Sequence, residues 1–166
     1  MKNLSVLLLG MVLLLSGCAT KSGFFSPDVL EQQALSYTKK AQIYNSLEIK
    51  ATIVATYLNP LLKEYDKKDD SIFLISFFID EDSSDPKKQG LYNQEYKLTL
   101  NGNLPQKIEP LKQNDDLIKL LPIKNMWSHY YLVRFEKPAS KELHMILESK
   151  RFGSATMDFQ AKASSF

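Results

Sequence analysis

Cysteine is nearly absent from this 166-residue chain, in which Cys18 is the only one. Because a second thiol is lacking, the chain has no internal disulfide to form. A lone thiol also excludes zinc sites built from several thiolates. A free thiol would be a liability in an oxidising compartment, so we expect Cys18 to be chemically modified if the protein is exported.

The residues of common catalytic and cofactor sites are also scarce. The two histidines, His129 and His144, have no partner at metal-ligand spacing. The six glycines form no phosphate-binding loop, and no Gly-x-Ser-x-Gly motif marks a nucleophile. The 21 basic and 19 acidic residues nearly balance, which gives no electrostatic basis for binding nucleic acid. We therefore expect a protein that is not an enzyme, holds no cofactor and has no nucleic-acid partner.

The N-terminus has the organisation of a secretory signal. Lys2 supplies the positive start, and an apolar run of about 12 residues follows it from residue 4 to residue 15. A helix that spans a bilayer needs about 20 apolar residues, so this run is too short to remain in the membrane. Residues 1–17 are thus predicted to be a signal peptide that is removed.

At the end of this run, Leu15-Ser16-Gly17-Cys18 resembles the lipobox of bacterial lipoproteins. The resemblance implies cleavage before Cys18 and attachment of an S-diacylglycerol and an N-acyl chain to it, so that membrane lipid becomes a partner. Two or more acyl chains suffice for stable anchoring. In Gram-negative lipoproteins an aspartate after the cysteine tends to retain the protein at the inner membrane. Ala19 stands there instead, which favours the periplasmic face of the outer membrane, with the inner membrane or cell membrane as the alternative.

Residues 18–25 are predicted to be the lipidated cysteine and a short tether, and residues 26–166 a single globular domain. Removing residues 1–17 leaves 149, enough for one domain with a hydrophobic core. Ser26-Pro27-Asp28 combines an N-cap hydroxyl, a proline and an acid, which indicates a helix start. Apolar positions then recur at steps of four and three, at Leu30, Ala34, Tyr37, Ala41 and Tyr44. We expect one helix over residues 26–45.

The pattern then changes to that of strands. Apolar and polar residues alternate from 47 to 57, with Leu47 and Ile49 on the apolar side. Residues 72–79 are apolar throughout, which predicts a central strand covered on both faces, on one of them by the N-terminal helix. Shorter strands are predicted at 96–100, 117–121, 130–135, 143–147 and 155–159. About seven strands within residues 46–160 favour a mainly β fold, an antiparallel immunoglobulin-like β-sandwich with one N-terminal α-helix. A half-open β-barrel or an α+β roll is the alternative.

Two groups of residues are candidates for a binding site. Asp80, Asp82 and Asp85 lie in an acidic loop and are weak candidates for calcium ligands, because the loop lacks the glycine and the distal glutamate of an EF-hand. Trp127, Tyr130 and Tyr131 form an aromatic cluster in the sequence. Exposed aromatic side chains anchor protein and sugar ligands, so this cluster is the candidate ligand surface.

The helix-plus-sandwich pattern after the anchor resembles that of uncharacterised Gram-negative lipoproteins, which implies no specific activity. The leading hypothesis is a membrane-anchored lipoprotein of the cell envelope that binds another envelope protein as a non-catalytic assembly or scaffold module. The first alternative is a glycan- or cation-binding module that uses Trp127, Tyr130 and Tyr131 or the Asp80–Asp85 loop. The second alternative is a hydrolase with an unrecognised site.

Overall fold

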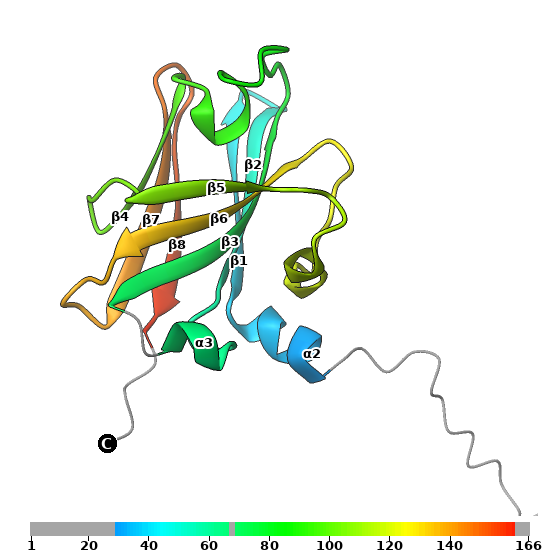
Figure 1. Ribbon diagram of the computed structural model, residues 1–166. Coiled ribbons are helices and arrows are strands. Elements are labelled where there is room, and N and C mark those ends of the chain that lie inside the picture. Colours follow the sequence, from blue (N-terminus) through cyan, green and yellow to red (C-terminus); the bar gives the residue numbers. More distant parts are fainter. Residues whose placement is uncertain (1–28, 67–68, 162–166) are drawn as a thin grey trace, which may run out of the picture.

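The computed structural model describes residues 29–66 and 69–161 (Figure 1). The predicted signal peptide, the lipobox with Cys18, and the tether lie outside the described residues. Within the described part of the chain, no helix is both long enough and apolar enough to cross a membrane. The anchor therefore stays a prediction from the sequence.

Within the described residues, eight strands form two antiparallel sheets. The larger sheet has the order β1-β2-β3-β6-β5, with β1 at Thr38–Asn45, β2 at Glu48–Tyr57, β3 at Asp70–Ile79, β6 at His129–Glu136 and β5 at Lys107–Leu111. The smaller sheet has the order β4-β7-β8, with β4 at Tyr96–Leu100, β7 at Glu142–Ser149 and β8 at Gly153–Gln160. The helices are short: α2 (Val29–Ser36), α3 (Lys63–Asp66) and the 3-10 turns η1 (Gly90–Tyr92) and η2 (Asp116–Leu120). The mainly β fold predicted from the sequence is confirmed.

The two sheets face each other across the main hydrophobic core. Phe73 of β3 lies at its centre, fully buried, with its ring 4.9 Å from that of Tyr57, 5.9 Å from that of Phe135 and 5.1 Å from that of Phe159. Because Phe159 belongs to β8, this aromatic cluster joins the two sheets. Strands β1 and β8 also lie against each other and close one side of the sandwich-like core.

A second, smaller core covers the outer face of β3. Ile72 and Leu74 are fully buried there. Their cover comes from several short elements: Ala34 of α2, Tyr65 of α3, and Ile118, Leu120 and Leu121 in and after η2. The prediction that residues 72–79 are buried on both faces is confirmed. The N-terminal helix supplies only part of the cover, since η2 contributes more apolar side chains.

The predicted helix over residues 26–45 is wrong in its second half. Within the described residues, α2 ends at Ser36, and Thr38 begins strand β1, so the strands start before residue 46. The Thr38 hydroxyl donates to the Ala34 carbonyl oxygen at 2.7 Å, which occupies an end-of-helix acceptor. Ala41 and Ile43 then face the core at a spacing of two, while Tyr44 is half exposed. Ala41 fits both the helical and the extended period, and hydrogen bonding to β2 makes this segment a strand.

The strand predicted at residues 117–121 is also wrong. The Asp115 carboxylate accepts a hydrogen bond from the N–H of Leu117 at 3.0 Å and caps the 3-10 turn η2. The missing strand is β5, which the sequence gives little sign of because it is short and contains Pro110.

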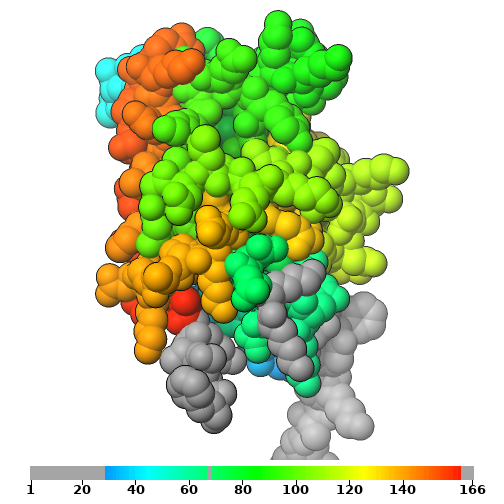
Figure 2. Space-filling model, turned by 60° about the vertical axis from the view of Figure 1, so that its left-hand side comes forward, coloured from blue at the N-terminus to red at the C-terminus, as the bar shows by residue number. Residues whose placement is uncertain are grey.

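Strand β5 is one of the two edge strands of the larger sheet, and part of its free edge is occupied. The Tyr92 hydroxyl donates to the Ile108 carbonyl oxygen at 3.2 Å from the side away from β6. Backbone groups of alternate residues point to the same edge, so Pro110 places a residue without an N–H on that edge too. In Figure 2 the segment around β5 crosses the middle of this face, below the loop that follows β3.

Candidate functional site

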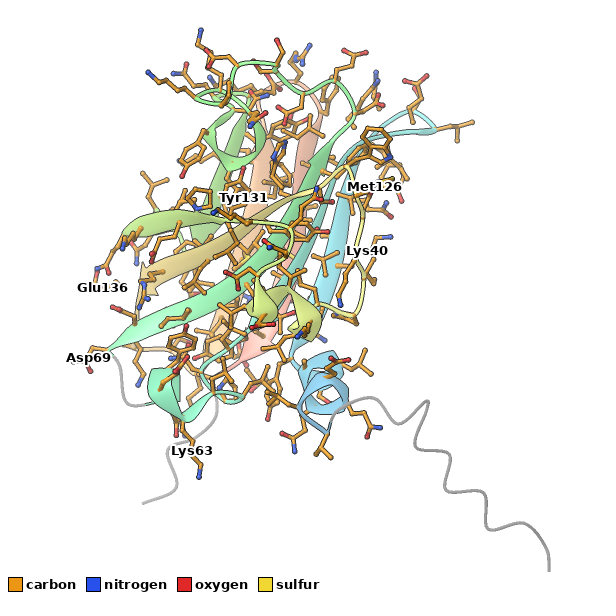
Figure 3. The ribbon with its side chains drawn as sticks, turned by 45° about the vertical axis from the view of Figure 1, so that its right-hand side comes forward. Lys40, Lys63, Asp69, Met126, Tyr131 and Glu136 are labelled. Carbon is orange, nitrogen blue, oxygen red and sulfur yellow. The ribbon has the colours of Figure 1, made fainter. Side chains whose placement is uncertain are left out.

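Several large apolar side chains are exposed where the β1–β2 hairpin meets the segment before β6. We call Tyr44, Ile49, Ile123, Met126 and Trp127 the distal patch. Met126 and Trp127 are each 73% exposed, and Leu47 at the hairpin tip is 97% exposed. Figure 3 places Met126 and Lys40 of β1 on the same side of the molecule. Exposed apolar side chains gathered in this way are typical of interaction surfaces.

The Met126–Trp127 turn is held in one conformation by hydrogen bonds. The N–H of Ser128 donates to the Asn125 carbonyl oxygen at 3.0 Å, which closes a four-residue turn. The Asn125 side chain accepts from the N–H of Trp127 at 3.0 Å. From beneath, the Tyr130 hydroxyl donates to the Asn125 carbonyl oxygen at 2.8 Å and accepts from the Asn125 N–H at 3.2 Å. The turn therefore presents two large apolar side chains to solvent on a fixed backbone.

Beside this turn, the outer face of β1, β2 and β3 forms a concave site of about 260 Å³, which we call the outer-face hollow. It is lined by Lys40, Ile49, Thr52, Val54, Ser76, Phe78, Ile123, Asn125 and Ser128. Four of these nine residues are apolar, and the distal-patch residues Ile49 and Ile123 are among the four. Lys40 carries the only charge among these lining residues.

A β-bulge brings Ile49 into this hollow. The pairing of β1 with β2 runs Ile43 to Ala51 and then Tyr44 to Ile49, so Lys50 is the extra residue. The prediction that Leu47 and Ile49 share the buried face with Ala51 is wrong, since Ile49 is 40% exposed. The bulge reverses the alternation at the end of the hairpin, a shift that the sequence pattern does not reveal.

On the other side of the Met126–Trp127 turn lies a second concave site of about 280 Å³, the aromatic hollow. It is lined by Pro86, Gln89, Tyr92, Pro110, Leu111, Gln113, Ser128, His129, Tyr130 and Tyr131. Ser128 lines both hollows, so the turn forms the wall between them. The Gln113 amide fixes this wall further by donating to the Met126 carbonyl oxygen at 3.1 Å.

The three aromatic residues singled out in the sequence do not form one platform. Trp127 is exposed, whereas Tyr130 and Tyr131 are 5% and 2% exposed. As neighbours on β6 the tyrosines point to opposite faces, Tyr130 into the smaller core and Tyr131 into the main core. Sequence reasoning found Trp127 but missed Met126, Ile123, Ile49 and Lys40. The one available signal was Asn125-Met126-Trp127-Ser128, in which turn-forming residues flank two large apolar ones.

The acidic loop uses its carboxylates within the protein. Asp80 lies 3.0 Å from the Lys50 ammonium, and this contact, with Glu48, raises the pKa of Lys50. Asp85 accepts from the N–H of Lys87 at 3.0 Å. The described residues contain no group of three histidine, cysteine, aspartate or glutamate side chains placed to hold a metal ion. The three aspartates therefore point to separate partners and do not converge on one centre.

Asp82 organises the loop between β3 and β4. Its carboxylate accepts from the N–H of Gly90 at 2.8 Å and from the Asn93 amide at 3.3 Å, and it lies 3.2 Å from His129 Nε2. Gly90 adopts φ +57°, and a Cβ there would collide with the Tyr131 hydroxyl. Asp82 and Gly90 thus bind this loop to β6 and shape the aromatic hollow. The other histidine, His144, bonds Asp158 at 2.8 Å on the exposed face of β7 and β8.

From the raised pKa of the Tyr131 hydroxyl we predict how the stability of the fold changes at alkaline pH. Burial raises the pKa of Tyr131 to about 12, although the Leu91 N–H that donates to its oxygen lowers it. Above pH 10 the unfolded chain releases this proton while the folded chain keeps it, so stability falls as the pH rises toward 12. In urea unfolding at pH 8, 10 and 11, we expect Tyr131→Phe to reduce the alkaline loss by on the order of 1–2 kcal/mol. An equal loss in both proteins would contradict this assignment.

Comparisons with protein-family models, with curated proteins and with solved structures found no match to this chain.

Proposed function

We propose that this protein is a membrane-anchored lipoprotein of the cell envelope that binds another envelope protein through the distal patch and is not an enzyme. The observation that carries the proposal is the Met126–Trp127 turn. Three side chains, those of Asn125, Tyr130 and Gln113, hydrogen-bond to its backbone while its own two large side chains face solvent.

A fixed turn of this kind is suited to binding. Tryptophan is enriched among the residues that contribute most to protein interfaces. Ordering a mobile loop on binding costs free energy, and a turn that is already ordered avoids that cost. Exposing Trp127 and Met126 gains nothing for the fold, because burial of apolar surface is what stabilises it. A partner that covers them explains why the surrounding residues hold them outward.

The position of the distal patch fits an N-terminal anchor. In Figure 1 helix α2 lies at one end of the molecule, and the β1–β2 hairpin lies at the other. Strand β1 has 8 residues, which corresponds to roughly 26 Å at 3.3 Å per residue. A lipid on Cys18 would join the chain at the α2 end. The patch then faces away from the bilayer, where a protein partner can reach it.

We also propose that the fold is immunoglobulin-like. In constant-type immunoglobulin domains one sheet has the order A-B-E-D and the other C-F-G. Naming β2 to β8 as A to G gives the orders β2-β3-β6-β5 and β4-β7-β8, which are those of this protein. Strand β1 is then an addition beside strand A. Such sandwiches often serve as binding modules, an analogy that agrees with the proposed role.

Site-specific photo-cross-linking tests the interaction surface. Trp127 is replaced by p-benzoylphenylalanine in the full chain, and intact cells are irradiated. We expect a covalent adduct with a second protein. The matched control carries the cross-linker at Leu104, which is also apolar and exposed but lies outside the distal patch. No adduct from position 127, or the same adduct from both positions, would refute the proposal. Asn125→Ala should reduce the yield at position 127, because the turn loses its side-chain bond to Trp127.

The anchor has its own test. Cys18→Ser removes the sulfur that would receive the diacylglycerol, so we expect complete loss of palmitate labelling and accumulation of the unprocessed precursor. Ser16→Ala keeps Cys18 and replaces one small residue of the lipobox with another, so this variant should still be labelled. Labelling that persists in Cys18→Ser would end the lipoprotein proposal without affecting the distal patch.

A glycan-binding role is the second candidate, and the aromatic hollow favours it. Tyr92 is partly exposed there, and the amides of Gln89 and Gln113 line the same site. A sugar ring could stack on Tyr92 and bond the amides. Binding of soluble glycan fragments that Tyr92→Ala abolishes and Trp127→Ala leaves unchanged would favour this candidate. The cation-binding hypothesis gains no support, because the aspartates of the acidic loop bond to groups of the protein itself.

A further inference from the structure

Lys40 lies in the outer-face hollow without a carboxylate partner among the described residues. Its Nζ takes part in none of the ion pairs or hydrogen bonds found there, whereas Lys50 on the same hairpin has Glu48 and Asp80 at 3.0 Å. Lys40 pairs with Val54 across the β1–β2 ladder and is exposed. It is the only charged residue that lines the hollow. An unpaired cation therefore stands at the edge of an apolar concave site.

The rest of the hollow can accept an apolar side chain. Ile49, Val54, Phe78 and Ile123 supply apolar walls. One polar group of the lining is already engaged, since the Thr52 hydroxyl accepts from the Gln42 amide at 3.1 Å. A volume of about 260 Å³ has room for one large side chain. The adjacent Met126–Trp127 turn would cover such a side chain from one side.

We propose that the distal patch binds a protein segment in which an apolar side chain stands beside a carboxylate. The apolar side chain fills the outer-face hollow, and the carboxylate pairs with the Lys40 ammonium. This inference rests on the proposed protein-binding function and specifies the chemistry of the partner. Charge complementarity carries it, because the hollow offers one cation and no anion.

The same charges disfavour two other occupants. A second copy of the chain would bring its own distal patch, with a second Lys40 and no carboxylate in the hollow, so a two-fold contact lacks charge complementarity. A bilayer with anionic headgroups would meet the carboxylates of Glu48, Asp80 and Glu81, which gather around Lys50 at the same end of the hairpin. Three acids around one lysine repel such a surface.

Trp127 allows a direct test, because it is the only tryptophan in the chain. Its fluorescence therefore reports on the distal patch alone. The full chain, reconstituted in phosphatidylcholine nanodiscs, is titrated with N-acetylphenylalaninate and with its neutral analogue N-acetylphenylalanine amide. Both probes carry the same ring, and only the first carries a carboxylate. We expect the carboxylate probe to shift the Trp127 emission and to bind about two- to fivefold more tightly, the range for an exposed ion pair.

Two charge reversals on β1 complete the test. Lys40→Glu should remove or invert the preference for the carboxylate probe. Lys39→Glu makes the same charge change on the adjacent residue, which pairs with Ala55 and points to the other face, and should keep the preference. Both side chains are exposed, and circular dichroism checks that both variants fold.

Equal binding of the two probes, no binding, or a preference that survives Lys40→Glu would overturn the inference. So would an emission shift with phosphatidylglycerol vesicles and none with the carboxylate probe, which would favour a lipid surface. An emission shift that depends on protein concentration alone would favour a second copy of the chain. None of these results would remove a protein adduct formed at position 127, so failure of the inference is distinguishable from failure of the proposed function.

Discussion

Phe73→Ala is expected to lower the free energy of unfolding by about 3–5 kcal/mol, the range for large-to-small changes of buried aromatic residues. Phe73 is fully buried, and its ring contacts those of Tyr57, Phe135 and Phe159. Phe135 and Tyr57 lie in the larger sheet and Phe159 in the smaller one, so the cavity would open between the sheets. Urea unfolding followed by circular dichroism measures the loss.

Phe73→Leu is the control for this prediction. Leucine keeps most of the buried apolar surface but removes the ring contacts, so about 1–2 kcal/mol should be lost. A loss below about 1 kcal/mol for Phe73→Ala would mean that the ring does not join the two sheets. The main core would then have a different centre.

Gly90→Ala is expected to cost about 2–4 kcal/mol, from a left-handed backbone and an overpacked contact together. Gly90 adopts φ +57°, which residues with a Cβ rarely occupy. In addition, a Cβ there would collide with the buried Tyr131 hydroxyl. Asp82 accepts from the Gly90 N–H, so a displaced backbone would also lose that bond. Thermal and urea unfolding would measure the change.

Gly102→Ala provides the matched control, because Gly102 also has positive φ, at +85°, but nothing lies within 4 Å of its Cβ position. Its cost should be about 1 kcal/mol. In the double variant Gly90→Ala, Tyr131→Phe, the colliding oxygen is gone, so the two losses should not add. Additive losses, or equal costs at the two glycines, would show that Tyr131 does not restrict Gly90.

The sequence predicted β4, β7 and β8, which bury alternate residues, and also β6, in which residues 130–133 are all buried. The predicted strand at 96–100 coincides with β4, and those at 130–135, 143–147 and 155–159 lie within β6, β7 and β8. Alternation of apolar residues is visible locally, so no tertiary information is needed. Strand β5 was not predicted, because only its pairing with β6 makes it a strand. Residues 38–45 were not predicted as a strand, because Ala41 fits a helical and an extended period equally well.

The partners of buried polar residues also cannot be predicted from a local sequence pattern. Asn59-Pro60 follows β2, which ends at Tyr57. The structure adds that Asn59 is buried and makes three hydrogen bonds, donating to the carbonyl oxygens of Tyr65 and Asp70 and accepting from the N–H of Ile72. These partners belong to two elements, α3 and β3. No spacing in the sequence identifies them.

The candidate site could be predicted only in part. Trp127 was named as a candidate from the sequence. Its separation from Tyr130 and Tyr131 depends on the hydrogen-bond partners of the two tyrosine hydroxyls. The Tyr130 hydroxyl bonds Asn125 and the Tyr131 hydroxyl bonds Leu91. The Tyr131 contact joins residues 40 positions apart in the sequence, which no local pattern reveals. The contribution of Ile49 depends on a bulge, which is a property of the pairing between two strands. The contribution of Lys40 depends on residues 38–45 forming a strand, where the sequence predicted a helix.

The occupied part of the β5 edge affects how copies of this protein associate when they are crowded. An outermost strand with free amides invites a neighbouring molecule to extend the sheet, and repeated addition leads to fibres. Pro110 withholds one donor, and the Tyr92 hydroxyl occupies the Ile108 acceptor next to it. Both features disfavour extension of the sheet at β5, so we expect crowded copies of the protein to stay separate along this edge.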